Sequence, residues 1–201
     1  MTAIGVSLLL QNGGLMVLGP NFRSYPAGLI TKEQIIIPAF GGQIMLTTLQ
    51  LLILVVTVVM MLILQYIVRY TRTGKAMRAV SHDKSAAQLM GINVDNTVSF
   101  TFFIGSSFAA VAGVLMGLYY NTIHPMMGLM PGLKAFIAAV IGGIGIIPGA
   151  MMGGFALGIF EALVSGYWSS KLRDPIVFLL LIIVLLVKPA GLLGKNESEK
   201  V

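Results

Sequence analysis

The stretch Gln43-Ile-Met-Leu-Thr-Thr-Leu-Gln-Leu-Leu-Ile-Leu-Val-Val-Thr-Val-Val-Met-Met-Leu-Ile-Leu-Gln-Tyr-Ile-Val68 decides the fold of this chain. Its 26 residues carry no charge, and about 20 apolar residues suffice for a helix to cross a bilayer, so a tilted span is expected. Lipid offers the backbone no hydrogen bonds, so the span should be helical. The run Leu51–Leu64 lacks the alternation of polar and apolar residues that a membrane β-barrel strand requires.

The composition of the whole chain agrees with a membrane protein. It is 57% hydrophobic and 10% charged, whereas about 25% of the residues in a soluble domain are charged, and its mean hydropathy is +0.93. The net charge of +6 does not indicate nucleic-acid binding, because the charges lie between or beside the apolar runs, where they orient helices. The chain has no cysteine, which excludes disulfides and thiolate sites. We therefore expect an all-α, polytopic transmembrane helical bundle.

Further apolar runs bring the expected number of membrane segments to about six. The first is marginal, because it has only 16 residues. A break rich in glycine and proline, Gly142–Gly149, divides one long run in two. Besides the opening stretch, the expected segments are Ala3–Leu18, Asn96–Tyr120, Ala135–Ile141, Ala150–Gly166 and Pro175–Val187.

The remaining stretches are expected to be loops and tight contacts. Asn21–Gly42 is mixed in polarity, and Ile35–Ile37 within it fits either a short strand or a dip into the membrane interface. Asn121–Lys134 is expected to be a loop. Small residues at four-residue spacing predict close helix packing at Ala109, Gly113 and Gly117 and at the pairs Gly149/Gly153 and Gly154/Gly158.

The hydrophilic loop 69–95 predicts the orientation. It holds five of the 13 basic residues, Arg69, Arg72, Lys75, Arg78 and Lys84, and such clusters beside spans stay in the cytoplasm. If the Gly142–Gly149 break is a hairpin turn, the loop, the turn, the tail and both termini lie inside, with eight basic residues there and five outside. The side chains of Arg69, Arg72, Lys75 and Arg78 are also candidates for contact with anionic lipid. A role in orienting the spans alone explains these basic residues equally well.

The second half of this loop, Ser85-Ala-Ala-Gln-Leu-Met-Gly91, is a candidate docking surface. On a helix, Ala86, Ala87, Met90 and Gly91 would line one side, and Gly91 would end the helix. The spacing leaves two interpretations equally open: a shallow surface for another protein, or an interfacial helix without a partner.

Three blocks resemble a known family. Ala86-Ala87-x-x-x-Gly91 resembles the cytoplasmic motif of ABC-importer permeases that docks on the ATPase, with Ser85 where those proteins have Glu. The longer block Gly74–Val94 followed by Asp95, then Pro131–Gly149, then Lys188-Pro-Ala-Gly-Leu-Leu-Gly194 resemble, in order, the branched-chain amino acid ABC transporter permease family. Members of that family have further spans before the counterpart of Ala3–Leu18, so the chain resembles the later part of such a permease.

The resemblance implies one transmembrane permease domain over residues 1–201, N-terminally incomplete relative to the family, in a bacterial inner membrane. Within it, 69–95 would be the cytoplasmic coupling loop and 189–201 a cytoplasmic tail. The implied partners are ABC ATPase subunits, a second permease chain and a periplasmic binding protein that delivers the substrate. The implied coupling residues are Ser85, Ala86, Ala87, Gly91 and Asp95, and with Ser85 in place of Glu, docking would rest on the small Ala/Gly surface more than on charge.

The implied substrate is a branched-chain amino acid, and related permeases make a sugar or urea/amide the alternative. The chain has no Gly-x-x-x-x-Gly-Lys-Ser/Thr phosphate loop, so ATP hydrolysis is expected on a partner and not in this chain. An intramembrane enzyme would need a paired catalytic constellation inside the spans, and a secondary transporter would need several intramembrane ionisable groups or an internal repeat; neither is evident. No cofactor is expected. His82 and Asp83 do not indicate a metal site, because His124 should lie across the membrane.

Two features are candidates for the transport pathway. Glu161 is the only acid within an apolar stretch. It can line a pathway, lie near the outer interface, or pair with Lys171 or Lys134. The residues Gly142, Gly143 and Pro148 of the break fit either a broken helix that binds substrate at the midplane or a tight cytoplasmic turn.

Overall fold

The computed structural model describes residues 2–26, 34–39, 42–188, 191 and 194. The chain divides into two compact units, residues 1–127 and 128–201, which are described separately. The first unit contains α1 (Thr2–Leu18), β1 (Gln34–Ala39), β2 (Gly42–Thr47), α2 (Thr48–Tyr70), α3 (Arg72–His82), α4 (Lys84–Leu89) and α5 (Val94–Tyr120). The second contains α6 (Leu129–Gly142), α7 (Ile147–Tyr167), the 3₁₀ turn η1 (Ser170–Leu172) and α8 (Arg173–Val187).

Three helices of the described residues, α2, α5 and α7, are long and apolar enough to cross a membrane. The most apolar window of α2 has no residue buried inside the chain, and α5 buries only Ile104 and Gly117 of its 27 residues. Such large apolar surfaces require lipid or another protein chain to cover them. The predicted helical membrane bundle is thus confirmed, whereas the predicted number of six segments stays a prediction, since α1 and α6 have only 17 and 14 residues.

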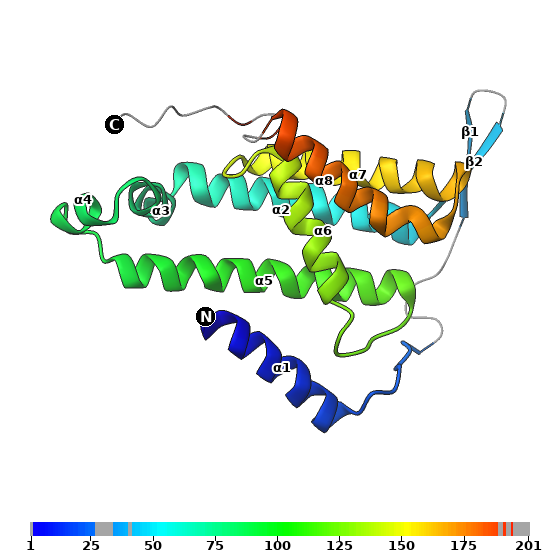
Figure 1. Cartoon of the computed structure of the whole chain (residues 1–201), viewed down its shortest axis with the longest axis horizontal. Helices are drawn as coiled ribbons and strands as arrows, with labels where there is room; N and C mark the ends of the chain where they lie inside the picture. The colour runs from blue at the N-terminus through cyan, green and yellow to red at the C-terminus, as the bar shows by residue number, and fades with distance from the viewer. Residues whose placement is uncertain (1, 27–33, 40–41, 189–190, 192–193, 195–201) are drawn as a thin grey trace. The chain divides into compact units, whose positions relative to one another are not determined.

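A two-stranded antiparallel hairpin precedes α2. Its strands β1 and β2 pair Gln34 with Thr47 and Ala39 with Gly42, so the strand interpretation of Ile35–Ile37 is confirmed. The predicted start of the span at Gln43 was wrong, because the chain there continues the hairpin ladder. The helix begins at Thr48, where the backbone N–H of Thr47 donates to the side chain of Gln50 at 3.1 Å. The hairpin and α3 lie at opposite ends of α2 (Figure 1).

Helix α5 begins at the cap residue Asn93, whose side chain accepts from the N–H of Asn96 at 3.0 Å. The helix contact predicted at Ala109, Gly113 and Gly117 stays a prediction, because no helix of the described residues packs against Gly113 or Gly117. A Cβ on Gly113 would meet nothing within 4 Å. One on Gly117 would meet side chains of Tyr25 and Ile123, which belong to loops and not to a helix.

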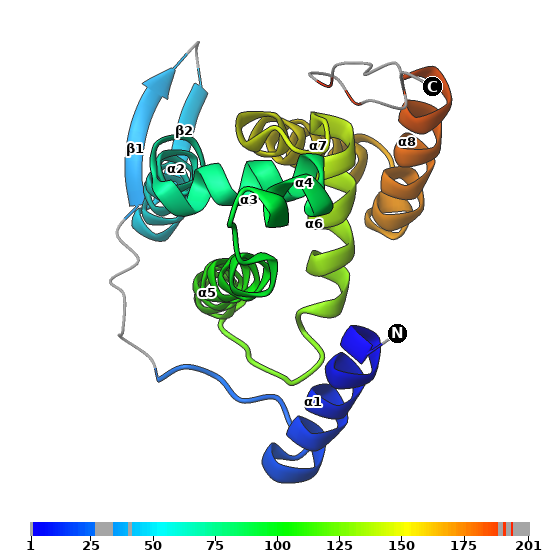
Figure 2. The same ribbon diagram turned by 90° about the vertical axis from the view of Figure 1, so that its left-hand side faces the viewer.

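The second unit is built around a helical hairpin. Helix α6 lies beside both α7 and α8 (Figure 2). The core of the unit is formed by Ile137, Ile141, Leu157 and Val177. The predicted loop up to Lys134 was too long: α6 already begins at Leu129, and Pro131 is tolerated because it lies in the first turn.

The Gly142–Gly149 break is a turn between α6 and α7, with residues 143–146 outside both helices. Here the two backbones touch: a Cβ on Gly142 would lie 2.0 Å from the carbonyl oxygen of Gly149, and one on Gly153 would lie 2.2 Å from that of Ala138. Close packing at Gly149/Gly153 is therefore confirmed. For the pair Gly154/Gly158 it stays a prediction, because within the described residues a Cβ on Gly154 would make only one contact, at 3.9 Å, and one on Gly158 none.

The chain after α8 returns to this turn. Gly191 is buried and has a φ of +80°, and a Cβ on it would lie 2.5 Å from the Cα of Gly143. The C-terminal sequence block thus contributes a backbone-to-backbone contact that only glycine allows.

Candidate functional site

The α2–α3 corner is the first element of the hydrophilic loop 69–95. Thr71 ends α2 and caps α3: its side chain donates to the carbonyl of Ile67 and accepts from the N–H of Gly74. Gly74 is buried against the end of α2, and a Cβ there would lie 2.2 Å from the carbonyl oxygen of Ile67. The guanidinium of Arg78 donates to the carbonyl oxygens of Val68 at 2.7 Å and Arg69 at 3.2 Å.

Helix α4 carries the small-residue motif. Asp83 caps it, and its carboxylate accepts from the N–H groups of Ser85 at 2.8 Å and Ala86 at 3.1 Å. Gly91 ends the turn with a φ of +79°, and the N–H of Ile92 donates to the carbonyl of Ala87 at 3.0 Å. The predicted role of Gly91 as a helix terminator is confirmed.

A groove of about 200 Å³ lies between α3 and α4. Ala86, Ala87 and Met90 line it, as the spacing predicted, and so do Ala79, His82, Asp83 and Ile92. Gly91, predicted on the same side, is not among its lining residues. Ala87 is buried, with 3% of its surface exposed, whereas Leu89 and Met90 are 89% and 82% exposed. The surface open to a partner therefore consists of Ala86, Leu89 and Met90 more than of Ala87.

The other predicted coupling residues lie nearby. Ser85 is exposed in the first turn of α4, and Asp95 is exposed in the first turn of α5. Ser85 carries no carboxylate, and Asp83 places one at the same helix terminus. The sequence also carried a signal for Asp83 that we did not use: an Asp directly before the helical stretch Lys-Ser-Ala-Ala is typical of an N-cap. No group of three His, Asp or Glu side chains that could hold a metal occurs among the described residues.

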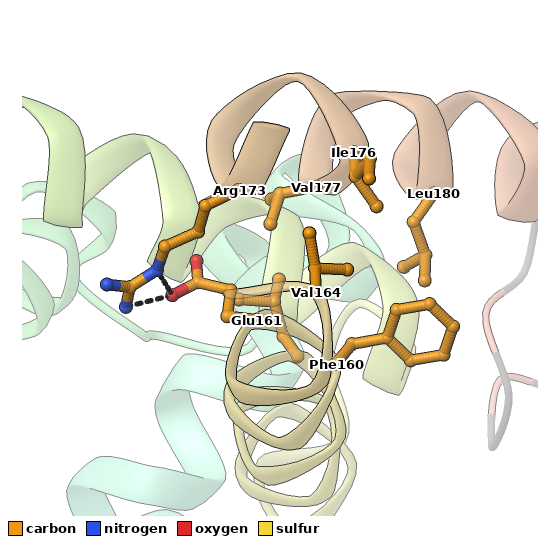
Figure 3. A pocket seen from close by; sticks show the side chains of 8 residues that line it. Phe160, Glu161, Val164, Arg173, Ile176, Val177 and Leu180 are labelled. Atoms are coloured by element: carbon orange, nitrogen blue, oxygen red, sulfur yellow. Dashed lines mark hydrogen bonds and ion pairs between the residues drawn. The ribbon is translucent and has the colours of Figure 1, made fainter. Parts of the chain in front are cut away.

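A charge cluster of Lys134, Glu161, Arg173 and Asp174 joins α6, α7 and α8. Glu161 is 5% exposed. Its Oε1 lies 2.8 Å from Nζ of Lys134, which also lies 2.7 Å from Oδ1 of Asp174. Its Oε2 accepts from Nε of Arg173 at 2.6 Å and also pairs with Nη2 of Arg173 (Figure 3). The carboxylate is thus matched by two cations.

The predicted pairing of Glu161 with Lys134 is confirmed, while the second cation is Arg173, and not Lys171, the alternative that we considered. Arg173 is 12 residues from Glu161, so no helical spacing signals the pair. The turn η1 makes it possible: Ser169 caps η1, and the hydroxyls of Ser165 and Ser170 lie 3.2 Å apart.

The space beside the cluster is small and apolar. Phe160, Val164, Ile176 and Leu180 help line it (Figure 3), and its volume is about 10 Å³. Such a volume holds about one water molecule. In this conformation it does not hold an amino acid, and the ion pairs of the cluster connect three helices.

The family described as "Branched-chain amino acid transport system / permease component" matches residues 1–186. The high-affinity branched-chain amino acid transport system permease proteins LivH of Salmonella typhimurium and of Escherichia coli K12 are each 47% identical over all 201 residues. The corresponding protein BraD of Pseudomonas aeruginosa is 40% identical over the same 201 residues. The chain spans 65% of the length of these relatives. No solved structure matches it.

Proposed function

Because the chain belongs to the family of branched-chain amino acid transport system permease components, we propose that it acts as a permease subunit of an ATP-binding-cassette importer. It would carry branched-chain amino acids across the bacterial inner membrane. The observation that carries this proposal is the 47% identity to the LivH proteins over the whole chain. The proposed subunit is not an enzyme: ATP is hydrolysed by partner ATPases, and a periplasmic binding protein delivers the substrate.

The proposed ATPase contact is the α3–α4 part of loop 69–95. This loop joins α2 to α5, two helices that are each long enough to cross the membrane, and its basic residues favour the cytoplasmic side. Exposed apolar side chains at Leu89 and Met90 beside a groove suit a protein partner better than water. In this proposal Ser85, Ala86, Gly91 and Asp95 face the partner, and Ala87 holds the loop together. The bare apolar surfaces of α2 and α5 would face lipid or the second permease chain.

A complementation experiment tests the proposal. The complete permease, co-expressed with candidate ATPase subunits, should retain them on purification and take up leucine, isoleucine and valine in an ATP-dependent manner. Ala86→Trp should reduce the bound ATPase at least about tenfold, because the indole would fill the groove that the partner enters. Its thermal unfolding should stay unchanged, since Ala86 is exposed.

The matched variant is Ala87→Trp, which should instead lower the unfolding temperature because Ala87 is buried. Failure of the wild type to retain any ATPase would refute the proposal. ATP-dependent uptake of ribose or urea in place of leucine would favour the alternative substrates, and uptake that continues without ATP would indicate a secondary transporter.

For the pathway we propose that Gly142, Gly143 and Pro148 form a cytoplasmic turn and that Glu161 acts through the charge cluster. The buried contact of Gly142 with Gly149 and the position of Pro148 in the first turn of α7 support this proposal.

Accessibility of Ile144 distinguishes the turn from a midplane binding site. Ile144 is 74% exposed within the turn, and the chain has no cysteine of its own. A membrane-impermeant maleimide should label Ile144→Cys from the cytoplasmic side only, at the rate of an exposed thiol. Labelling that substrate slows, or that also occurs from outside, would mean that the break lines the pathway. Ser81→Cys, exposed on α3, is the cytoplasmic control.

A further inference from the structure

The α2–α3 corner carries more interactions than a change of direction requires. A single residue, Thr71, separates the two helices. Three different residues of this short stretch nevertheless tie α3 to the last turn of α2: the hydroxyl of Thr71, the bare Cα of Gly74 and the guanidinium of Arg78. All three contact the carbonyls of residues 67–69 in the last turn of α2, where backbone N–H partners run out; the carbonyl of Ile67 still accepts from the N–H of Thr71 at 3.3 Å.

Each contact restricts a different motion. Gly74 brings the backbones together so closely that a methyl group would lie 2.2 to 2.3 Å from two carbonyl oxygens of α2. Arg78 spans from the second turn of α3 to two successive carbonyls, and its charge matches the negative end of the α2 dipole. Sliding would break the Arg78 bonds, and separation would open the Gly74 contact. The two helices therefore form one rigid body.

We propose that Gly74 and Arg78 are positioning residues that make α2 and α3 move together, so that a displacement of the α3–α4 surface by its partner is passed to the membrane helix α2. This inference rests on the proposed function, because it needs an ATPase to move the surface. It assigns Arg78 a role other than lipid contact or orientation, the two that its charge alone suggests.

The first test measures substrate transported per ATP hydrolysed by the whole transporter in proteoliposomes. Arg78→Gln and Gly74→Ala should keep the ATPase bound and active but lower this ratio about tenfold. Arg78→Lys should give an intermediate ratio, because it keeps the charge and the donors but places them on a shorter, more flexible side chain than the one that holds Nη1 at both carbonyls. Lys75→Gln removes the same charge from the same helix, and Gly113→Ala adds the same methyl group where nothing lies within 4 Å. Both controls should keep the ratio of the wild type.

The second test needs no ATPase. Spin labels on cysteines at Val59 of α2 and Ser81 of α3, both exposed, report the distance between the helices in the permease alone. With the corner unsubstituted, the distribution of distances between the two labels should be narrow. Arg78→Gln and Gly74→Ala should broaden this distribution.

The outcomes separate this inference from the proposed function. If the distribution of label distances stays narrow in both Arg78→Gln and Gly74→Ala, the rigid-body inference is overturned, whether or not an ATPase binds. A transport-to-ATP ratio that stays constant while both activities fall with the amount of assembled transporter also overturns it, because the corner would then serve stability alone. If no ATPase binds the wild type, the proposed function fails, and a broadened distance would still support the rigid corner.

Discussion

Replacing Glu161 by glutamine should lower the free energy of unfolding by about 2–3 kcal/mol, because it removes a buried charge from two partly exposed cations, Lys134 and Arg173. Glu161 is buried, and its carboxylate lies against Lys134 and Arg173. Glutamine removes the charge and leaves one acceptor oxygen where the carboxylate has two, so Lys134 would keep only the half-exposed Asp174 as an ion-pair partner and the ion pair of Arg173 with Glu161 would be lost. Unfolding of the purified permease in mild detergent, followed by circular dichroism, measures the change.

A double-mutant cycle shows whether the cost comes from unpaired charge. Lys134→Met together with Glu161→Gln removes one cation with the anion, and should be less destabilising than the sum of the two single variants. Asp174→Asn is the control: its side chain is 50% exposed, so its loss should cost no more than about 1 kcal/mol. If Glu161→Gln proves as mild as Asp174→Asn yet abolishes transport, the carboxylate serves the pathway and the interpretation of the cluster as an ionic tie between helices is wrong.

Replacing Gly153 by leucine should prevent the helical hairpin from closing, at a cost of about 3 kcal/mol or more. A Cβ at Gly153 would lie 2.2 Å from the carbonyl oxygen of Ala138 and 2.8 Å from the nitrogen of Gly142. Both are backbone atoms, so no side chain can rotate away to make room. We expect little of this variant in the membrane fraction, and a large fall in the unfolding temperature of what remains.

The control lies on the same helix. A Cβ at Gly158 would meet nothing within 4 Å, so Gly158→Leu adds equal bulk without a clash inside this chain. It should leave the unfolding temperature of the isolated permease nearly unchanged. Equal damage from both variants would mean that any bulk on α7 is harmful, and that the close contact with α6 is not the cause.

Features set by local chemistry were predictable from the sequence. The long uncharged run from Leu51 to Val68 predicts a membrane helix, and Gly91 followed by Ile92 is a standard helix end. The hairpin at Gly142–Gly149 follows from its glycines and from Pro148, which suits the first turn of a helix. These predictions depend only on residues close together in the chain.

Features set by distant partners were not predictable. The start of α2 at Thr48 depends on β2 pairing with β1, whereas the sequence there is as apolar as the span itself. Arg173 reaches Glu161 only because η1 folds the chain back. The burial of Ala87 depends on how α3 and α4 pack, and the bonds of Arg78 cross from one helix to another. In each case the spacing in sequence carries no sign of the contact.

The charge cluster contains two positive and two negative side chains, so its net charge is zero when all four are ionised. Moving one elementary charge through a membrane potential requires about 2.3 kcal/mol per 100 mV. A cluster whose charges cancel can shift across the same field as a unit without electrical work. Under the proposed function, the four side chains of the cluster would therefore add no electrical work to a movement of the helices that they join.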